Sequence, residues 1–498
     1  MLEDLVIALS LASFWFLQEW RPYLYPEIHH LRYLNGYSVG LLALILSVIA
    51  LSLALWIVLR FLRRWEGRFL WGAGHLFLFM LVLSPLNYLR TVDHQAVHHP
   101  VLSVLFWKTH LGDKYLWTLA ATGGLGVVVA FLKSARVIRW FREAMLVLAA
   151  FVVSTGVQSA YIFASVGVRG MSEFGKSAAS PPVVVILFDE LSQSLAEHAV
   201  RQGLMPEFER LRRESFVARN AHSPGDYTNL AVSIYLSGRR PKEIMLPPWA
   251  SHEEYFSPER VAELREAGNI FQDAHLRGYR VSVTGFFLPY CHLFGKSLDA
   301  CTDLSGVSPA PGITFTRRLK HIWERRLNNA FGENRIWVYK HLLRTTLDRV
   351  EEDRYTFLYV HWSIPHAPRV FDRVTGQLSG AADNSLSGYQ DNLALVDRSL
   401  GNLRSALEST KLWDRAVVVL LSDHALHPPN VTWDCPRTKP ECADRRVPLM
   451  IKFPTQKHGA LYDGEVKLGG FRRIIQAILN RELVDPEGAS SWFARLGK

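Results

Sequence analysis

At 498 residues the chain is longer than one hydrophobic core normally supports, so two structural units are expected. Its residues are 49% hydrophobic and only 20% charged, but the balance changes sharply between residues 165 and 182. The formal net charge of +10 comes from scattered basic residues, many of them beside apolar segments, which argues against nucleic-acid binding and for a membrane surface.

The first part of the chain holds five stretches that are apolar enough to predict membrane spans, each of which needs about 20 residues. The expected spans are Leu5–Trp20, Gly36–Leu59, Phe69–Leu89, Tyr115–Leu132 and Ala144–Ala164. The first is the shortest, so four spans are the alternative. Acidic residues precede it and no small-residue cleavage site follows it, so we do not expect a cleaved signal peptide.

Basic residues collect after the second and fourth stretches, which predicts that these two loops are cytoplasmic. They are Arg60, Arg63, Arg64, Arg68, Lys133, Arg136, Arg139 and Arg142. Five spans with an inside N-terminus predict a multi-pass protein of the inner (plasma) membrane with everything after Ala164 outside the cytoplasm. The other loops hold His29, His30, His94, His98 and His99. We interpret these as ordinary polar residues, with a metal site as the alternative.

All four cysteines lie in the later, soluble part of the chain. They form two short-range pairs, Cys291 with Cys301 and Cys435 with Cys442. Local disulfides are our interpretation, and they persist only in an oxidising compartment. A zinc site made of all four is the alternative, although the spacings do not match CxxC motifs.

A polar stretch rich in Gly, Ser and Pro separates the two parts, so we expect a transmembrane domain over 1–165, a linker over 166–182 and an α/β domain over 183–498. In the α/β domain, short β-branched runs alternate with helical patterns. The predicted strands are Val183–Phe188, Arg280–Thr284, Thr356–His361, Ala416–Leu421 and Leu449–Phe453. The predicted helices are Ser192–Ser215, Pro258–Arg277, Thr316–Glu351 and Tyr389–Ser409. This pattern predicts a mostly parallel sheet sandwiched by helices.

Two of the predicted strands end in groups that bind divalent cations. The first ends in Asp189-Glu190, two adjacent carboxylates after a run of apolar residues. The fourth is followed by Asp423-His424. Carboxylate oxygens and imidazole nitrogens suit zinc and manganese, and the carboxyl ends of parallel strands meet at one edge of a sheet. Each pair alone could instead cap the following helix, and that alternative stays open.

Four further polar residues could carry chemistry. Thr228 follows a Pro-Gly-Asp turn and precedes an apolar segment, which predicts a helix start where backbone N–H groups can hold a phosphate or sulfate. It is either a nucleophile activated by a metal or base, or a simple N-cap. His361 ends the third strand, His366 follows in a loop with two prolines, and His427 follows the Asp-His pair. They could assist a leaving group or bind an anion, or be ordinary loop histidines.

Taken in order, these motifs resemble those of the alkaline phosphatase/sulfatase superfamily: an acidic pair after the first strand, a threonine, an HxxxxH loop and a late SDH. The likeness is strongest to membrane phosphoethanolamine transferases and lipoteichoic acid synthases, which also have five spans followed by an extracytoplasmic catalytic domain. Two more fragments are similar to sulfatases, YQDNLALVDRSLGNLRSAL before the SDH strand and RVPL at Arg446–Leu449.

The resemblance implies a role for each matching position. The implied metal ligands are Asp189, Glu190, Thr228, Asp423 and His424. The metal would be zinc first, with manganese, magnesium or calcium as alternatives. The implied catalytic residues are Thr228, which would attack phosphorus, and His366, which would assist the leaving group. The implied substrate contacts are His361, His366 and His427.

Some positions depart from the family pattern. Formylglycine sulfatases need CxPxR or SxPxR, whereas Thr228 is followed by Asn-Leu-Ala-Val, and SDHG becomes SDHA at Ala425. The resemblance therefore implies a transferase that moves a phosphoethanolamine- or phosphoglycerol-type head group from a membrane phospholipid to an envelope glycan or lipid acceptor. A hydrolase of sulfate or phosphate esters and a non-catalytic lipid-binding regulator are the alternatives.

Overall fold

The computed structural model describes two compact units of the chain. The described residues are 2–16, 20, 37–64, 134–165, 181–240, 264, 267–288, 290–304, 315–316, 319–320, 322–323, 331–379, 385–426 and 443–496. The first unit comprises Met1–His30, Gly36–Gly167 and Thr314–Trp323, and the second Leu31–Asn35, Val168–Ile313 and Glu324–Lys498. Several predicted features lie outside the described residues: the third and fourth spans, the loop histidines, most of the linker, Cys435, Cys442 and His427.

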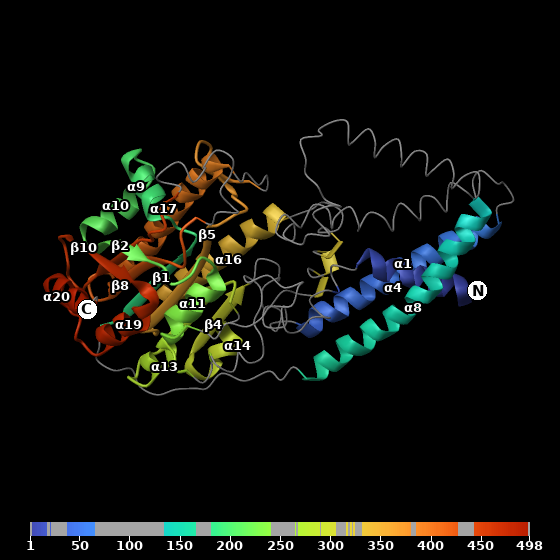
Figure 1. The fold of residues 1–498 in the computed structure, drawn as a ribbon, viewed down its shortest axis with the longest axis horizontal. Helices are drawn as coiled ribbons and strands as arrows, with labels where there is room; N and C mark the ends of the chain where they lie inside the picture. Colours follow the sequence, from blue (N-terminus) through green and yellow to red (C-terminus); the bar gives the residue numbers. More distant parts are fainter. Residues whose placement is uncertain are drawn as a thin grey trace. The chain divides into compact units, whose positions relative to one another are not determined.

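The first unit contains three described helices, α1 (Leu2–Trp15), α4 (Tyr37–Arg64) and α8 (Ser134–Ser165) (Figure 1). Helix α1 packs against both of the others. Among the described residues, one helical stretch is long and apolar enough to cross a membrane, Gly40–Phe61 in α4. Figure 1 shows α1 and α8 running in the same direction and α4 in the opposite one.

The second unit is built on an eight-stranded sheet, in the order β10-β2-β9-β8-β1-β5-β3-β4. The strands are β1 (Val183–Asp189), β2 (Phe216–His222), β3 (Val281–Phe286), β4 (Ala300–Leu304), β5 (Phe357–Pro365), β8 (Val417–Ser422), β9 (Leu449–Lys452) and β10 (Ala460–Lys467). Strand β9 is antiparallel to both neighbours, and the other pairs are parallel. The predicted mostly parallel sheet is confirmed. A separate hairpin joins β6 (Phe371–Asp372) to β7 (Gln377–Leu378).

Helices cover both faces of this sheet because its central strands are apolar on both sides. All seven residues of β1 are buried, and successive residues alternate between two hydrophobic clusters. One cluster contains side chains of α11 (Thr228–Ser237), α13 (Ile270–His275), α14 (Tyr290–Phe294), α19 (Phe471–Leu479) and α20 (Pro486–Leu496). The other contains side chains of α9 (Gln193–Arg201), α10 (Pro206–Arg213), α16 (Phe331–Glu351) and α17 (Leu386–Ser409). Short 3-10 helices occupy Gly295–Ser297 and Leu468–Gly470.

The predicted helices differ from the observed ones mainly at their ends. The single helix expected over Ser192–Ser215 is two helices, because Gly203 takes a left-handed φ of 74° and Pro206 starts α10. In the region of the helix expected over Pro258–Arg277, α13 covers Ile270–His275 and starts from an Asn269 cap. The expected strand ending at His361 continues to Pro365 in β5. Prediction therefore located the elements better than their boundaries.

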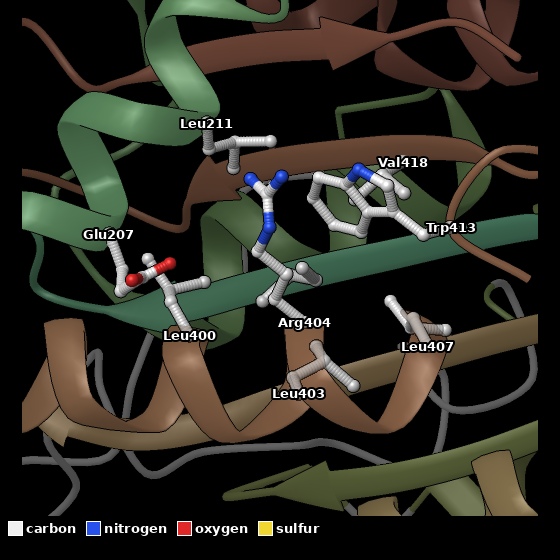
Figure 2. A pocket seen from close by; sticks show the side chains of 9 residues that line it. Glu207, Leu211, Leu400, Leu403, Arg404, Leu407, Trp413 and Val418 are labelled. Atoms are coloured by element: carbon white, nitrogen blue, oxygen red, sulfur yellow. The ribbon is translucent and has the colours of Figure 1, made fainter. Parts of the chain in front are cut away.

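Figure 2 shows how α17 packs on β1 and β8 around a cavity of about 10 Å³. The Arg404 guanidinium lies 4.2 Å from the centre of the Trp413 ring, and its Nη2 donates to both carboxylate oxygens of Glu214 at 3.0 Å. Leucines of α17 complete the lining of the cavity. Arg404 is thus a buried arginine that is paired with Glu214 where α17 packs on the sheet.

A disulfide between Cys291 and Cys301 joins α14 to β4, with Cα atoms 5.5 Å apart, and confirms the first of the two predicted pairs. It closes a short loop between residues ten apart. Because a crosslink limits the unfolded chain, we expect the Cys291→Ser/Cys301→Ser variant to be less stable by about 2.5 kcal/mol. Urea unfolding of both proteins in detergent tests this, and equal midpoints for the oxidised wild type and the variant would contradict it.

Candidate functional site

Strands β1 and β8 end side by side at the carboxyl edge of the sheet, where Phe188 pairs with Ser422. The chain then turns sharply, because Glu190 has a left-handed φ of 71° that is rare for a residue with a side chain. The turn is held by a hydrogen bond from Leu191 N–H to Ser422 Oγ (2.8 Å) and one from Tyr389 Oη–H to the Glu190 carbonyl (2.7 Å). Backbone strain of this kind concentrates at functional sites.

Thr228 is the first residue of α11, and the helix cap is Tyr227. The N-cap alternative for Thr228 is therefore wrong. Its Oγ1 lies 3.5 Å from Asp189 Oδ1 and 3.4 Å from His424 Nε2, and the residue is 7% exposed. The hydroxyl thus faces the ends of β1 and β8. The first turn of a helix also presents backbone N–H groups that suit an anion.

Three buried side chains converge on one point beside Thr228. The ligand atoms of Asp189, Asp423 and His424 all lie within 4.8 Å of one another. Asp423 Oδ1 accepts hydrogen bonds from the N–H groups of Glu190 (2.9 Å) and His424 (2.6 Å). Its buried Oδ2 has no hydrogen-bond partner among the described residues and lies 3.5 Å from His424 Nε2.

This donor set fits a divalent cation. His424 Nδ1 lies 2.8 Å from the Ala425 carbonyl, which can only accept, so the proton belongs on Nδ1 and the Nε2 lone pair faces the cluster. Two carboxylates, one imidazole and the nearby hydroxyl match the oxygen and nitrogen preference of zinc and manganese. The side chains of Asp189, Asp423, His424 and Thr228 would hold the ion.

The burial of these groups shifts their proton affinities. Burial raises the pKa of Asp189 to about 6, although His366 lowers it and Asp423 raises it further. Burial alone would lower the pKa of His424, but Asp423, Glu190 and Asp189 outweigh it, so the net direction is upward. A bound cation takes the place of such protons and removes the repulsion between the carboxylates.

The structure places two of the three predicted substrate-binding histidines near this cluster. His361 is fully buried inside β5, where its Nδ1 is 2.8 Å from Tyr290 Oη, and burial lowers its pKa to about 4. Its Nε2 is buried without a hydrogen-bond partner among the described residues. His366 follows β5, and its N–H donates to the Asp189 carbonyl at 3.1 Å.

Two buried arginines at the site were not predicted from the sequence. Arg335 Nη2, from α16, lies 3.8 Å from Asp189 Oδ2, and Arg369 Nη2 lies 3.9 Å from Glu190 Oε2. The close group of three ligand residues does not include Glu190, a predicted ligand. Arg369 directly follows the PHAP segment, which could have signalled it, whereas no local pattern distinguishes Arg335 from other arginines.

Comparison with known proteins now identifies the class. A family model described as Sulfatase matches residues 181–468, more than half of the chain, so this protein belongs to the sulfatase family. It is an enzyme of the sulfatase-like class, whose superfamily members use divalent metals. No curated protein matches the sequence.

Solved structures resemble the chain at low identity. Ps i-CgsB, solved in complex with k-i-k-neocarrahexaose, is 16% identical, with 64% of this chain and 76% of that chain covered and a TM-score of 0.46. The lipoteichoic acid synthase LtaP from Listeria monocytogenes is 12% identical, with 62% and 76% covered and a TM-score of 0.41. A protein of the alkaline phosphatase superfamily from Vibrio parahaemolyticus is 13% identical, with 61% and 67% covered and a TM-score of 0.39.

We expect Asp423→Asn to weaken zinc binding about tenfold or more, because it removes one anionic ligand and leaves the remaining oxygen for the N–H groups of Glu190 and His424. Zinc titration of the purified protein, followed by mass spectrometry of bound metal, measures this. The matched control is Asp397→Asn, a buried carboxyl on α17 that accepts from Phe208 N–H. Equal zinc affinity in wild type and Asp423→Asn would contradict the assignment.

Proposed function

We propose that this enzyme transfers a phosphoethanolamine- or phosphoglycerol-type head group from a membrane phospholipid to an envelope glycan or lipid acceptor. The observation that carries the proposal is the position of Thr228, whose hydroxyl faces Asp189 and His424 at the start of α11. A hydroxyl next to a carboxylate and a cation-binding group is the arrangement that an activated oxygen nucleophile needs.

The proposed reaction has two balanced steps. In the first, a bond forms between Thr228 Oγ1 and phosphorus while the bond between phosphorus and the diacylglycerol oxygen breaks. The Thr228 proton passes to Asp189, and His366 protonates the departing oxygen. In the second, an acceptor hydroxyl gives its proton to His366 and forms a bond to phosphorus, while the bond between phosphorus and Thr228 Oγ1 breaks and Asp189 returns the proton to Thr228. A divalent cation would supply positive charge to the phosphoryl oxygens.

The residues around Thr228 bear on the choice between phosphoryl and sulfuryl transfer. A formylglycine nucleophile is made from Cys or Ser, and the residue here is Thr followed by Asn229, Leu230, Ala231 and Val232. This supports phosphoryl transfer through a threonine. The alternative is hydrolysis of sulfate or phosphate esters with water as acceptor, which the family match favours.

The first unit supports anchoring of the enzyme in the membrane of its donor, which raises the local concentration of lipid at the site. Helix α4 presents exposed apolar side chains along its length, as a lipid-facing helix would. They are Leu42, Ile45, Leu46, Ile49, Leu53, Ile57, Val58 and Phe61. Helix α8 is 32 residues long and exposes Val147, Val153 and Val157.

An ion-pair cluster supports an odd number of spans. Arg142 Nη2 on α8 lies 2.6 Å from Glu3 Oε1 and 3.0 Å from Asp4 Oδ1 at the start of α1. The beginnings of both helices are therefore on the same side, and both helices run in the same direction (Figure 1). Each connection between consecutive spans reverses the direction of the chain. Two spans that run in the same direction are therefore separated by an even number of connections, which gives an odd number of spans, as in a five-span arrangement. The basic residues near Arg142 favour the cytoplasm for that side.

We expect a cysteine placed at residue 3 to be protected from an impermeant thiol reagent in intact cells, and one placed at Val374 to be labelled. Val374 is 88% exposed on the catalytic unit, at the tip of the β6–β7 hairpin. Both variants are made in a background with the native cysteines replaced. Labelling of both positions, or of residue 3 alone, would contradict the proposed topology.

We expect Thr228→Ala to release no diacylglycerol from labelled phosphatidylethanolamine or phosphatidylglycerol, whereas the wild type with zinc or manganese releases it from one of them. The physical reason is that alanine cannot form the covalent bond to phosphorus. Ser237→Ala is the matched control, since it removes a hydroxyl from the last residue of α11 whose hydrogen bonds in the structure are to backbone groups of Ser233 and Arg239. Mass spectrometry of the trapped protein should find the head group on Thr228.

The outcomes separate the two reactions. Diacylglycerol release that depends on an added acceptor supports the transferase, and release that is independent of acceptor supports the hydrolase. Turnover retained by Thr228→Ala would refute the threonine mechanism. No release from either lipid by the wild type, together with hydrolysis of a sulfate or phosphate ester, would leave the hydrolase.

A further inference from the structure

One stretch of the chain lies between two elements of the catalytic unit in the sequence but belongs to the first unit. Thr314–Trp323 falls between β4 and α16, and it clusters with α1, α4 and α8 rather than with the sheet. Its described residues, 315–316, 319–320 and 322–323, are all helical. We call Thr314–Trp323 the return segment, because the chain comes back to the first unit after β4 and leaves it again before α16.

The return segment packs at the end of α1 that is remote from the ion pairs of Glu3 and Asp4. The Trp323 ring meets the buried Phe16 ring edge to face, with centroids 5.4 Å apart, and Figure 1 shows the segment in yellow beside α1. Helix α1 has 14 residues and is therefore about 20 Å long, against a hydrocarbon layer of about 30 Å. In the proposed topology Glu3 and Asp4 are cytoplasmic, so Phe16 and Trp323 lie toward the extracytoplasmic boundary, where aromatic residues are enriched.

The return segment has the pattern of a helix that lies along a membrane surface. Its apolar residues recur at a helical spacing, and all of them are buried or half-buried: Phe315, Leu319, Ile322 and Trp323. Thr316 and Lys320, each one position further along than an apolar residue, are exposed. A helix with one apolar and one basic face favours the boundary between the hydrocarbon layer and the head groups.

The charge of the return segment is positive and is not balanced within it. The sequence from 314 to 323 contains Arg317, Arg318 and Lys320 and no Asp or Glu. Phosphate groups of anionic phospholipids supply the opposite charge in the plane of the bilayer, and each nearby Lys or Arg adds to the attraction. An acidic envelope polymer would supply negative charge too, but the contact of Trp323 with α1 places the segment at the boundary of the bilayer itself.

We propose that the return segment lies on the extracytoplasmic surface of the bilayer, where Arg317, Arg318 and Lys320 bind the phosphate groups of anionic phospholipids such as phosphatidylglycerol. The assignment rests on the proposed topology for the side of the membrane and is independent of the proposed reaction. Residues 324–330 alone connect the segment to α16, which carries Arg335 of the candidate site. Lipid bound by the segment would thus tether the start of α16 to the bilayer.

The test uses the full-length protein in lipid nanodiscs, with a bimane fluorophore on a single cysteine in a background with the native cysteines replaced. One probe is Thr316→Cys in the return segment, and the reference probe is Val374→Cys, on the exposed hairpin of the catalytic unit. A phosphatidylcholine with a nitroxide on its head group quenches probes that lie at the bilayer surface. The discs contain phosphatidylcholine with or without phosphatidylglycerol.

Three further changes, made with the probe at 316, separate the effect of charge from an effect on folding. Arg317→Gln/Arg318→Gln/Lys320→Gln removes the charge, whereas Arg317→Lys/Arg318→Lys keeps it. The matched control removes three exposed arginines from α10 and α16, whose side chains are 51%, 76% and 84% exposed: Arg210→Gln/Arg213→Gln/Arg344→Gln.

We expect the probe at 316 to be quenched about threefold or more as strongly as the probe at 374, and more strongly when phosphatidylglycerol is present. The glutamine variant should lose the increase caused by phosphatidylglycerol, and the lysine variant and the matched control should keep it. Equal quenching of the two probes, no effect of phosphatidylglycerol on the wild type, or equal losses in the glutamine variant and the matched control would each overturn the proposal.

The other possible partner and the proposed function give distinguishable results. Polyglutamate that binds the wild type but not the glutamine variant, with no effect of phosphatidylglycerol, would indicate an acidic polymer and overturn the lipid contact. Labelling of a cysteine at residue 3 in intact cells would overturn the extracytoplasmic side. Quenching as expected in a protein that releases no diacylglycerol would refute the transferase and leave the lipid contact assigned, because turnover enters none of these measurements.

Discussion

The carboxylate of Asp423 connects the fold to the site. Its Oδ1 accepts hydrogen bonds from the backbone N–H groups of Glu190 and His424, which ties the turn after β1 to the turn after β8. Both donors are buried, so each would be costly to leave unsatisfied. Because Oδ1 is occupied in this way, Oδ2 is directed toward His424 Nε2 and the space beside Thr228. The same side chain therefore stabilises the sheet edge and directs one carboxylate oxygen to the group of atoms that is suited to a cation.

Negative charge is concentrated at this edge at a cost in stability. Asp189, Glu190 and Asp423 are all at most 1% exposed, and burial raises the pKa of Asp189 to about 6. The left-handed backbone at Glu190 adds strain. Arg335 and Arg369 offset part of this cost with their positive charge, at 3.8 Å from Asp189 and 3.9 Å from Glu190, and a cation held by the cluster would offset more of it. Binding sites commonly show this exchange of local stability for function.

Much of the fold could be predicted because its central strands are buried on both faces. Burial on both sides requires uninterrupted apolar runs, and β1, β3, β5, β8 and β9 all came from such runs. The strands that were missed lie at or near the sheet edges. In β10, exposed residues alternate with partly buried ones and only Val466 is fully buried, and in β4 only the two end residues are fully buried, so neither forms a run that stands out. An edge strand forms because it pairs with the strand beside it, and its own composition does not reveal that pairing.

The sequence by itself determined which strands carry polar residues at their carboxyl ends, and hence that Asp189, Asp423 and His424 could belong to one site. Thr228, at a predicted helix start, was assigned to that site through the family resemblance. Chain direction in a parallel sheet is enough to bring such ends together. Only the tertiary structure decided which oxygen of Asp189 faces Thr228 and which faces Arg335. Arg335 lies 31 residues from His366 on a different element, and it reaches the site because α16 packs against β5. Contacts between elements depend on packing, which leaves no periodic pattern in the sequence.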